Sequence, residues 1–138
     1  MRAKLRFFLQ ICKFFTIFAA DLIKKLLFFM RLAIIGSRNC PQIDIMSHLK
    51  HLPTGVVSGG ARGADTYARE FAHKYHLPLT EYLPEYDKYG KAAPLIRNKL
   101  IVDNCDCLIA FWDGKSRGTK FTLDYAKEKG KPIKIVMI

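Results

Sequence analysis

The stretch VVSGGARGAD, residues 56–65, runs from an apolar segment through three glycines to an alanine and an aspartate. Its first residues are typical of a buried strand, and Gly63 begins a segment with apolar side chains at helical spacing. A glycine-rich turn of this kind joins a strand to the following helix in α/β proteins. It also leaves backbone N–H groups uncovered, which suits a negatively charged ligand.

Strands and helices are expected to alternate on both sides of this stretch. Short apolar runs predict strands, and apolar residues repeated every three to four positions predict helices. The expected strands are residues 31–36, 55–58, 77–83, 106–112 and 133–138, and the expected helices are residues 42–51, 63–76, 94–104 and 118–129. Residues 84–93 are expected to form a loop. This order predicts a Rossmann-like α/β fold, an open parallel sheet with helices on both faces.

Residues 1–29 differ from the domain expected over residues 30–138. They are rich in Phe, Leu and Ile, and six basic residues within positions 1–30 stand against one acid, Asp21. Most of the polar positions fall on one side of a helix, which predicts an N-terminal amphipathic helix able to lie on a membrane surface. The segment is too interrupted for a spanning helix of ~20 apolar residues. A signal peptide is one alternative interpretation, and a translation start placed too far upstream, with Met30 as the true start, is another. The domain itself is expected in the cytoplasm.

The composition leaves several classes of partner open. Half of the residues are apolar, which suffices for a core, and residues 31–138 hold 17 basic and 11 acidic residues. This moderate excess fits a phosphate-bearing partner, and it fits plain solubility equally well. None of the four cysteines has C-x-x-C spacing to another; they are Cys12, Cys40, Cys105 and Cys107. We therefore expect buried free thiols and do not expect a metal site. Cys105 and Cys107 are expected on one face of a strand.

Three expected loops share glycine, serine and a basic residue. They read GSRNC (36–40), SGGARGAD (58–65) and DGKSRGTK (113–120), and they follow the first, second and fourth strands. Ligands of open parallel sheets bind beyond the carboxyl ends of the strands. Uncovered backbone amides, and helix N-termini with a partial positive charge of ~0.5 e, suit a phosphate there. Turn formation alone is the alternative explanation for each loop. The candidate ligand- or phosphate-binding residues are Gly36, Ser37, Arg38, Ser58, Gly59, Gly60, Arg62, Gly63, Asp65, Asn98, Asp113, Ser116, Arg117, Gly118 and Thr119.

Other side chains near this edge have weaker support. Asp65 and Asp113 are the weak candidates for an acid–base group, should a reaction occur. Arg97 beside Asn98 either covers the ligand or is merely solvated. Tyr82, Tyr86 and Tyr89 surround the expected 84–93 loop, where an aromatic ring either stacks on a base or covers the edge of the core. The phosphate-binding motif G-x-x-x-x-G-K-[ST] is absent.

Four motifs in sequence order carry a resemblance to a known group. IIGSR, VVSGGARGAD, IRN and AFWDGKSRGTKFTLDYA together resemble the SLOG superfamily of Rossmann-like domains, in particular its YspA/YpsA-related branch, over residues 30–138. The resemblance implies a pocket for a nucleotide or ADP-ribose-like ligand in a sensor or accessory module. A homo-oligomer is also expected.

The wider superfamily offers two alternative functions. Its phosphoribohydrolases carry a P-G-G-x-G-T-x-x-E block, and alignment on Gly118 and Thr119 places Thr122 where the glutamate would stand. The missing carboxylate argues against hydrolysis of a nucleotide N-glycosidic bond. Other members bind single-stranded DNA, which the basic charge leaves open.

Overall fold

The computed structural model describes Arg6, Thr16, Ala19 and residues 30–138. The predicted amphipathic helix within residues 1–29 therefore lies almost entirely outside the described residues. No helix in the described part of the chain is both long and apolar enough to cross a membrane.

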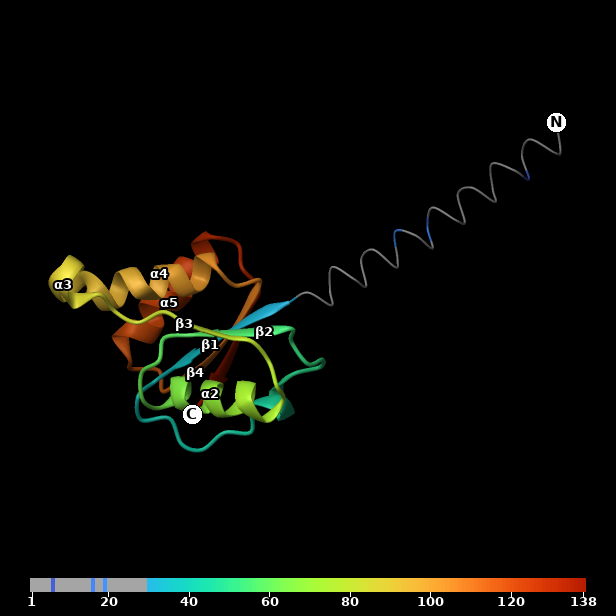
Figure 1. Cartoon of the computed structure of the whole chain (residues 1–138), viewed down its shortest axis with the longest axis horizontal. Coiled ribbons are helices and arrows are strands. Elements are labelled where there is room, and N and C mark those ends of the chain that lie inside the picture. The colour runs from blue at the N-terminus through green and yellow to red at the C-terminus, as the bar shows by residue number, and fades with distance from the viewer. Residues whose placement is uncertain (1–5, 7–15, 17–18, 20–29) are drawn as a thin grey trace.

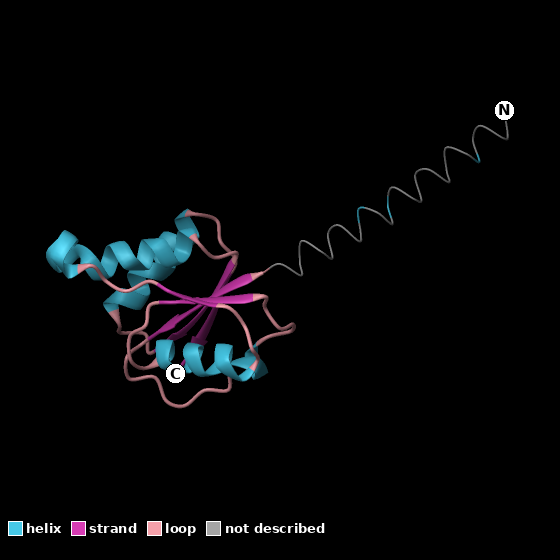
Figure 2. Ribbon diagram, viewed as in Figure 1, coloured by secondary structure: helices cyan, strands magenta, loops and turns pink. Residues whose placement is uncertain are grey.

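Five parallel strands form one sheet in the order β3-β2-β1-β4-β5. The strands are β1 (Arg31–Gly36), β2 (Gly55–Ser58), β3 (Leu79–Glu81), β4 (Cys107–Trp112) and β5 (Ile133–Met137). The chain builds the sheet outward from β1 in one direction and then returns to add β4 and β5 on the other side. The direction of winding thus changes between β1 and β4. The predicted Rossmann-like α/β fold is confirmed (Figure 2).

Helices cover both faces of the sheet (Figure 1). The α-helices are α2 (Ala64–Lys74), α3 (Tyr86–Tyr89), α4 (Ala93–Asp103) and α5 (Arg117–Glu128), and the 3-10 helices are η1 (Ile45–His48) and η2 (Gly90–Ala92). One apolar cluster lies between the sheet and α2 with η1, and it includes Ile34, Phe71 and Phe111. The other lies between the sheet and α4 with α5, and it includes Ile101 and Leu123.

Two segments differ from their predicted structure. The helix expected over residues 42–51 is reduced to η1, which is bounded by extended backbone at Asp44 and Leu49. Ile43, Met46 and Leu49 still pack against the core, so their spacing reflects burial of an irregular segment rather than a helix. The loop expected over residues 84–93 contains α3 and η2. Neither buries a residue, so apolar periodicity gave no signal for them.

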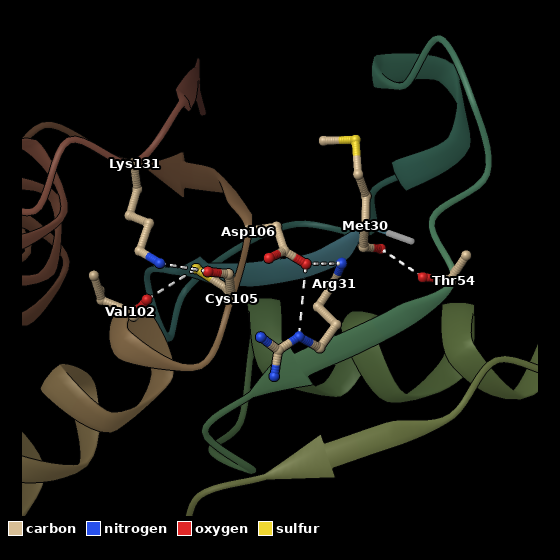
Figure 3. Close-up of polar contacts among 7 residues, drawn as sticks. All are labelled: Met30, Arg31, Thr54, Val102, Cys105, Asp106 and Lys131. Carbon is tan, nitrogen blue, oxygen red and sulfur yellow. Dashed lines mark hydrogen bonds and ion pairs between the residues drawn. The ribbon is translucent and has the colours of Figure 1, made fainter. Parts of the chain in front are cut away.

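Cys40, Cys105 and Cys107 are free thiols, but the prediction that Cys105 and Cys107 share one face of a strand is wrong. Cys105 is buried in the cluster under α4 and α5, whereas Cys107 packs against the cluster on the α2 face. Cys105 precedes β4 and so lies outside its alternating residues. Burial raises the pKa of Cys105 to about 11, so the thiol stays protonated and donates to the Val102 carbonyl oxygen at 3.3 Å (Figure 3). Cys12 lies outside the described residues.

Polar contacts fix the amino end of β1 between its two neighbours (Figure 3). The Asp106 carboxylate accepts the Arg31 N–H at 2.8 Å and lies 3.6 Å from the Arg31 Nε. The Met30 carbonyl oxygen accepts the Thr54 N–H at 2.9 Å and the Thr54 hydroxyl at 3.2 Å. These contacts align the three central strands at their amino ends, so that their carboxyl ends lie together at the other end of the strands.

Candidate functional site

A pocket of about 480 Å³ opens at the carboxyl ends of β1 and β4, where the direction of winding changes. The loops after β1, β2 and β4 and the first half of α4 meet around it. The residues that line it are Ile35, Gly36, Ser37, Arg38, Asn39, Ala61, Asp65, Pro94, Leu95, Arg97, Asn98, Ile101, Asp113, Lys115, Ser116, Gly118, Thr119 and Thr122. Open parallel sheets bind their ligands in this position.

The loops after β1 and β4 are joined through Ser37. Its backbone N–H donates to the Phe111 carbonyl oxygen at 3.0 Å, and its buried hydroxyl accepts the Asp113 N–H at 3.2 Å. Arg38 follows directly, lines the pocket and is exposed. Hydrogen bonds therefore fix this part of the pocket lining, and the exposed Arg38 side chain forms no hydrogen bond or ion pair with another described residue.

The β4–α5 loop is held by Asp113. The carboxylate Oδ1 accepts the N–H groups of Lys115 at 2.9 Å and Ser116 at 2.8 Å. These N–H groups stabilise the charged form, so the pKa of Asp113 lies below its usual value. Asp113 is thus an ionised group that shapes the loop, and the pocket wall includes part of it.

The N-terminus of α5 opens into the pocket. Ser116 caps the helix by accepting the N–H and the hydroxyl of Thr119, at 3.5 Å and 3.1 Å. In this first turn, the N–H groups of Arg117 and Gly118 have no partner in the described part of the chain. Apart from its chain neighbours and the backbone of its own helix, no heavy atom of the described residues lies within 4 Å of the position that a Cβ on Gly118 would occupy. The Gly118 amide, at the positive end of the helix dipole, therefore belongs to the pocket lining, whereas Arg117 lies outside it.

Arg97 brings a buried positive charge to the pocket. Its side chain, in a residue only 9% exposed, donates from Nη1 to the Gly59 carbonyl oxygen at 2.5 Å and from Nε to the Asn98 side-chain oxygen at 2.9 Å. Burial lowers the pKa of Arg97, the Asp65 carboxylate raises it and the Arg38 charge lowers it further. No carboxylate of the described residues lies within 4 Å of this guanidinium. The interpretation of Arg97 as merely solvated is wrong.

Asp65 holds the β2–α2 loop from the start of α2. Its carboxylate accepts the Ala61 N–H at 3.1 Å, and the residue is 9% exposed. Burial raises the pKa of Asp65, against the lowering effects of the Ala61 amide, the Ser58 hydroxyl and Arg97. The Ser58 hydroxyl lies near this carboxylate but is buried without a well-formed hydrogen bond. Asp65 therefore combines a structural role with a perturbed pKa at the pocket wall.

The structure brings most of the predicted site residues together. Those that line the pocket are Gly36, Ser37, Arg38, Asp65, Asn98, Asp113, Ser116, Gly118 and Thr119. Those outside its lining are Ser58, Gly59, Gly60, Arg62, Gly63 and Arg117. The second group comes mainly from the β2–α2 loop, which is held by Asp65 and Arg97 and contributes only Ala61 to the pocket lining before α2 begins.

Gly63 shows why that loop is rich in glycine. It has a φ of 82°, and a Cβ on it would stand 2.6 Å from the carbonyl oxygens of Ser37 and Arg38. Such a Cβ would collide with the β1 loop. Gly63 therefore lets α2 begin directly against that loop, which is a packing role.

Comparison with known proteins identifies the family of the chain. The chain is similar to the Gene 61 protein of Mycobacterium phage D29, with 33% identity over 84 residues that cover 56% of this chain and 67% of the phage protein. The chain belongs to the Gene 61 protein family. No family model and no solved structure matches it. The name of the phage relative states no ligand or reaction, so the function of this Gene 61 family member has to be argued from its pocket.

Part of the pocket of this Gene 61 family member was not predicted from the sequence. The unpredicted lining residues are Ile35, Asn39, Ala61, Pro94, Leu95, Ile101 and Thr122, whereas Arg97 and the basic residue Lys115 of the third loop were weaker candidates. The α4 lining could have been predicted from the sequence. Pro94 and Ile101 lie four residues before and three residues after Asn98, so they share a helix face with that predicted site residue. None of Tyr82, Tyr86 and Tyr89 lines the pocket. Among the described residues, no three His, Cys, Asp or Glu side chains gather as a metal site would need.

Proposed function

We propose that this Gene 61 family member is a SLOG-type domain that binds a nucleotide or ADP-ribose-like phosphorylated ligand, as a sensor or accessory module. The observation that carries the proposal is the buried Arg97 guanidinium, which lines the pocket with no carboxylate of the described residues in ion-pair contact and with only the more distant Asp65 charge to offset it. Burial of a charge is costly unless an opposite charge compensates it. A ligand phosphate in the pocket supplies that charge.

Arg38 strengthens the electrostatic argument. Its charge acts on Arg97 and lowers the Arg97 pKa, so the two cations repel each other. Lys115 adds a third cation to the lining. An anion between these groups relieves the repulsion, and guanidinium groups bind phosphate oxygens through paired hydrogen bonds.

The remaining lining fits the two halves of a nucleotide. The Gly118 amide, which has no hydrogen-bond partner among the described residues, provides an anion site at the N-terminus of α5. Pro94, Leu95 and Ile101 present apolar surface from α4 for a base or ribose. The volume of about 480 Å³ lies in the range of small-molecule pockets, roughly 300–1,000 Å³.

Isothermal titration of the full chain with AMP, NAD and ADP-ribose tests this proposal. We expect at least one of them to bind, and we expect adenosine and ribose, which lack phosphate, to bind far more weakly. Absence of binding by all three nucleotides to well-folded protein would refute the proposal. Binding of single-stranded oligonucleotides that mononucleotides do not displace would favour the nucleic-acid alternative instead.

One observation favours a second candidate function, cleavage of a nucleotide N-glycosidic bond. Asp65 lines the pocket and has a raised pKa, which suits a group that exchanges a proton. Against it, the Thr122 hydroxyl, at the position of the phosphoribohydrolase glutamate, donates to the Gly118 carbonyl oxygen at 2.9 Å. Release of free base from nucleoside monophosphates, lost in Asp65→Asn, would support this second function. Intact ligand after prolonged incubation would exclude it for the nucleotides tested.

A further inference from the structure

The two edges of the sheet differ in how they are protected. The β3 edge has three residues, and its Glu81 forms an ion pair with Arg69 at 2.9 Å. The β5 edge has five residues and presents Ile135 and Met137, which are 40% and 62% exposed. Short strands and charged side chains discourage pairing at a sheet edge, whereas longer apolar edges invite it. The β3 edge is both short and charged, whereas the longer β5 edge has one charged residue, Lys134.

The hydrogen bonds to β4 determine which groups of β5 face outward. The Pro132 carbonyl oxygen accepts from Leu108, and the Ile138 N–H donates to Trp112, so even-numbered residues of this segment turn their backbone toward β4. The N–H and carbonyl groups of the odd-numbered residues therefore point away from the sheet. Ile133, Ile135 and Met137 carry both the apolar side chains and the backbone groups that have no partner among the described residues.

We propose that β5 pairs antiparallel with β5 of a second copy, about a two-fold axis at Ile135, to form one continuous sheet across a dimer. In this register Ile135 lies opposite Ile135 of the partner subunit and exchanges both backbone hydrogen bonds with it. Ile133 lies opposite Met137 of the partner subunit. Each free donor of the edge then meets a free acceptor of the same edge.

The charge pattern favours a second copy as the occupant. Lys134 is the charged residue of β5, and its ammonium donates to the His48 carbonyl oxygen of its own chain at 2.7 Å. In the proposed register Lys134 faces Val136 of the partner subunit, so the two lysines do not oppose each other. Every cross-strand pair on the other face is apolar, and such pairs stabilise antiparallel sheets. A symmetric interface needs this self-complementarity.

Sedimentation of the full chain and of two charge variants tests the dimer. We expect a concentration-dependent dimer for the wild-type chain. Ile135→Lys and Ile135→Glu each place like charges opposite one another at the axis, so each is expected to raise the dimer dissociation constant about tenfold or more. An equimolar mixture of the two variants is expected to restore a dimer, because opposite charges then face each other.

Leu100→Lys is the matched control, since Leu100 on α4 is also 40% exposed and lies away from β5. It should dimerise as the wild type does. A wild-type chain that stays monomeric, a dimer that survives in Ile135→Lys, or a mixture that fails to reassociate would overturn the proposal. Should the Ile135 variants not fold, Met137→Lys carries the same expectation for dimer loss, because it places a charge against the partner's Ile133.

Discussion

Arg97 and Gly59, 38 positions apart in the sequence, meet through a hydrogen bond of 2.5 Å from the Arg97 guanidinium to the Gly59 carbonyl oxygen. This bond ties α4 to the loop after β2. It also fixes a positive charge at the pocket wall, where Arg38 adds a second one. The same contact thus joins two distant segments and sets the position of a charged group in the pocket lining.

Arg97→Met tests the structural half of this role. Methionine preserves much of the side-chain volume but leaves the Gly59 carbonyl oxygen without its donor, and an unpaired buried acceptor costs about 1–3 kcal/mol. We expect the free energy of unfolding, measured by urea denaturation, to fall by that amount. Arg62→Met, at an exposed arginine outside the pocket, should change it by less than about 0.5 kcal/mol. Equal effects of the two substitutions would contradict the account.

Gly63→Ala should destabilise the fold strongly. The new Cβ meets two carbonyl oxygens at 2.6 Å, and the φ of 82° is unfavourable for alanine, so a loss of about 2 kcal/mol or more is expected. Gly118→Ala is the matched control, because its Cβ enters open space in the first turn of α5. Thermal denaturation should show that Gly118→Ala is neutral or stabilising by a few tenths of a kcal/mol. A tolerated Gly63→Ala would show that α2 does not need this close approach.

Gly118→Asp should separate stability from binding. An aspartate in the first turn of α5 interacts favourably with the helix dipole, by about 0.3–1 kcal/mol, so the fold is maintained. The same carboxylate repels an anionic ligand, and nucleotide affinity should fall about tenfold or more. Gly118→Asn, which has a similar size and no charge, should weaken binding less. If both substitutions weaken binding equally in calorimetry, the effect is steric and the anion site at α5 is wrong.

Asp65 should leave a signature in the pH dependence of stability. Burial holds the folded-state pKa of Asp65 above its ordinary value of 3.8, so the folded chain keeps this proton to higher pH than the unfolded chain. Stability contributed through Asp65 is therefore lost as the pH rises from 3.8 through the folded-state pKa. The unfolding free energy of Asp65→Asn relative to wild type should accordingly increase over this interval.

Asp124→Asn provides a control of opposite sign for the pH measurement. Lys120, 2.7 Å away, lowers the pKa of this exposed carboxylate, so its small contribution is lost as the pH falls. Relative to wild type, the unfolding free energy of Asp124→Asn should therefore decrease slightly as the pH rises. A flat difference for Asp65→Asn would contradict the raised pKa.

The central strands were predictable from the sequence because of how they are buried. β1, β2 and β4 pack between helices on both faces, so they appear as continuous apolar runs with bounds within one residue of those observed. β3 is an edge strand of three residues between Pro78 and Pro84, and it was predicted too long. The helix expected over residues 42–51 failed because burial alone can produce helical spacing.

The site was predictable in position and less so in detail. The chemistry of the loops after β1 and β4 located the pocket, but glycines do not reveal which surface they approach. Gly63 and Gly118 stand in similar sequence contexts, yet one touches backbone and the other faces open space. The Arg97 contact joins distant parts of the chain, so no local pattern of residues predicts it.

Calorimetric titration of the wild type, Arg38→Ala and Arg62→Ala with the tightest-binding nucleotide is the most direct test of the anion pocket. Arg38 lines the pocket and Arg62 does not, although both are exposed arginines in glycine-rich loops. A hydrogen bond to a charged group contributes about 1.5–3 kcal/mol, so Arg38→Ala should weaken binding roughly ten- to a hundredfold. Arg62→Ala should bind like the wild type. Equal affinities of all three proteins, or a loss confined to Arg62→Ala, would contradict the account.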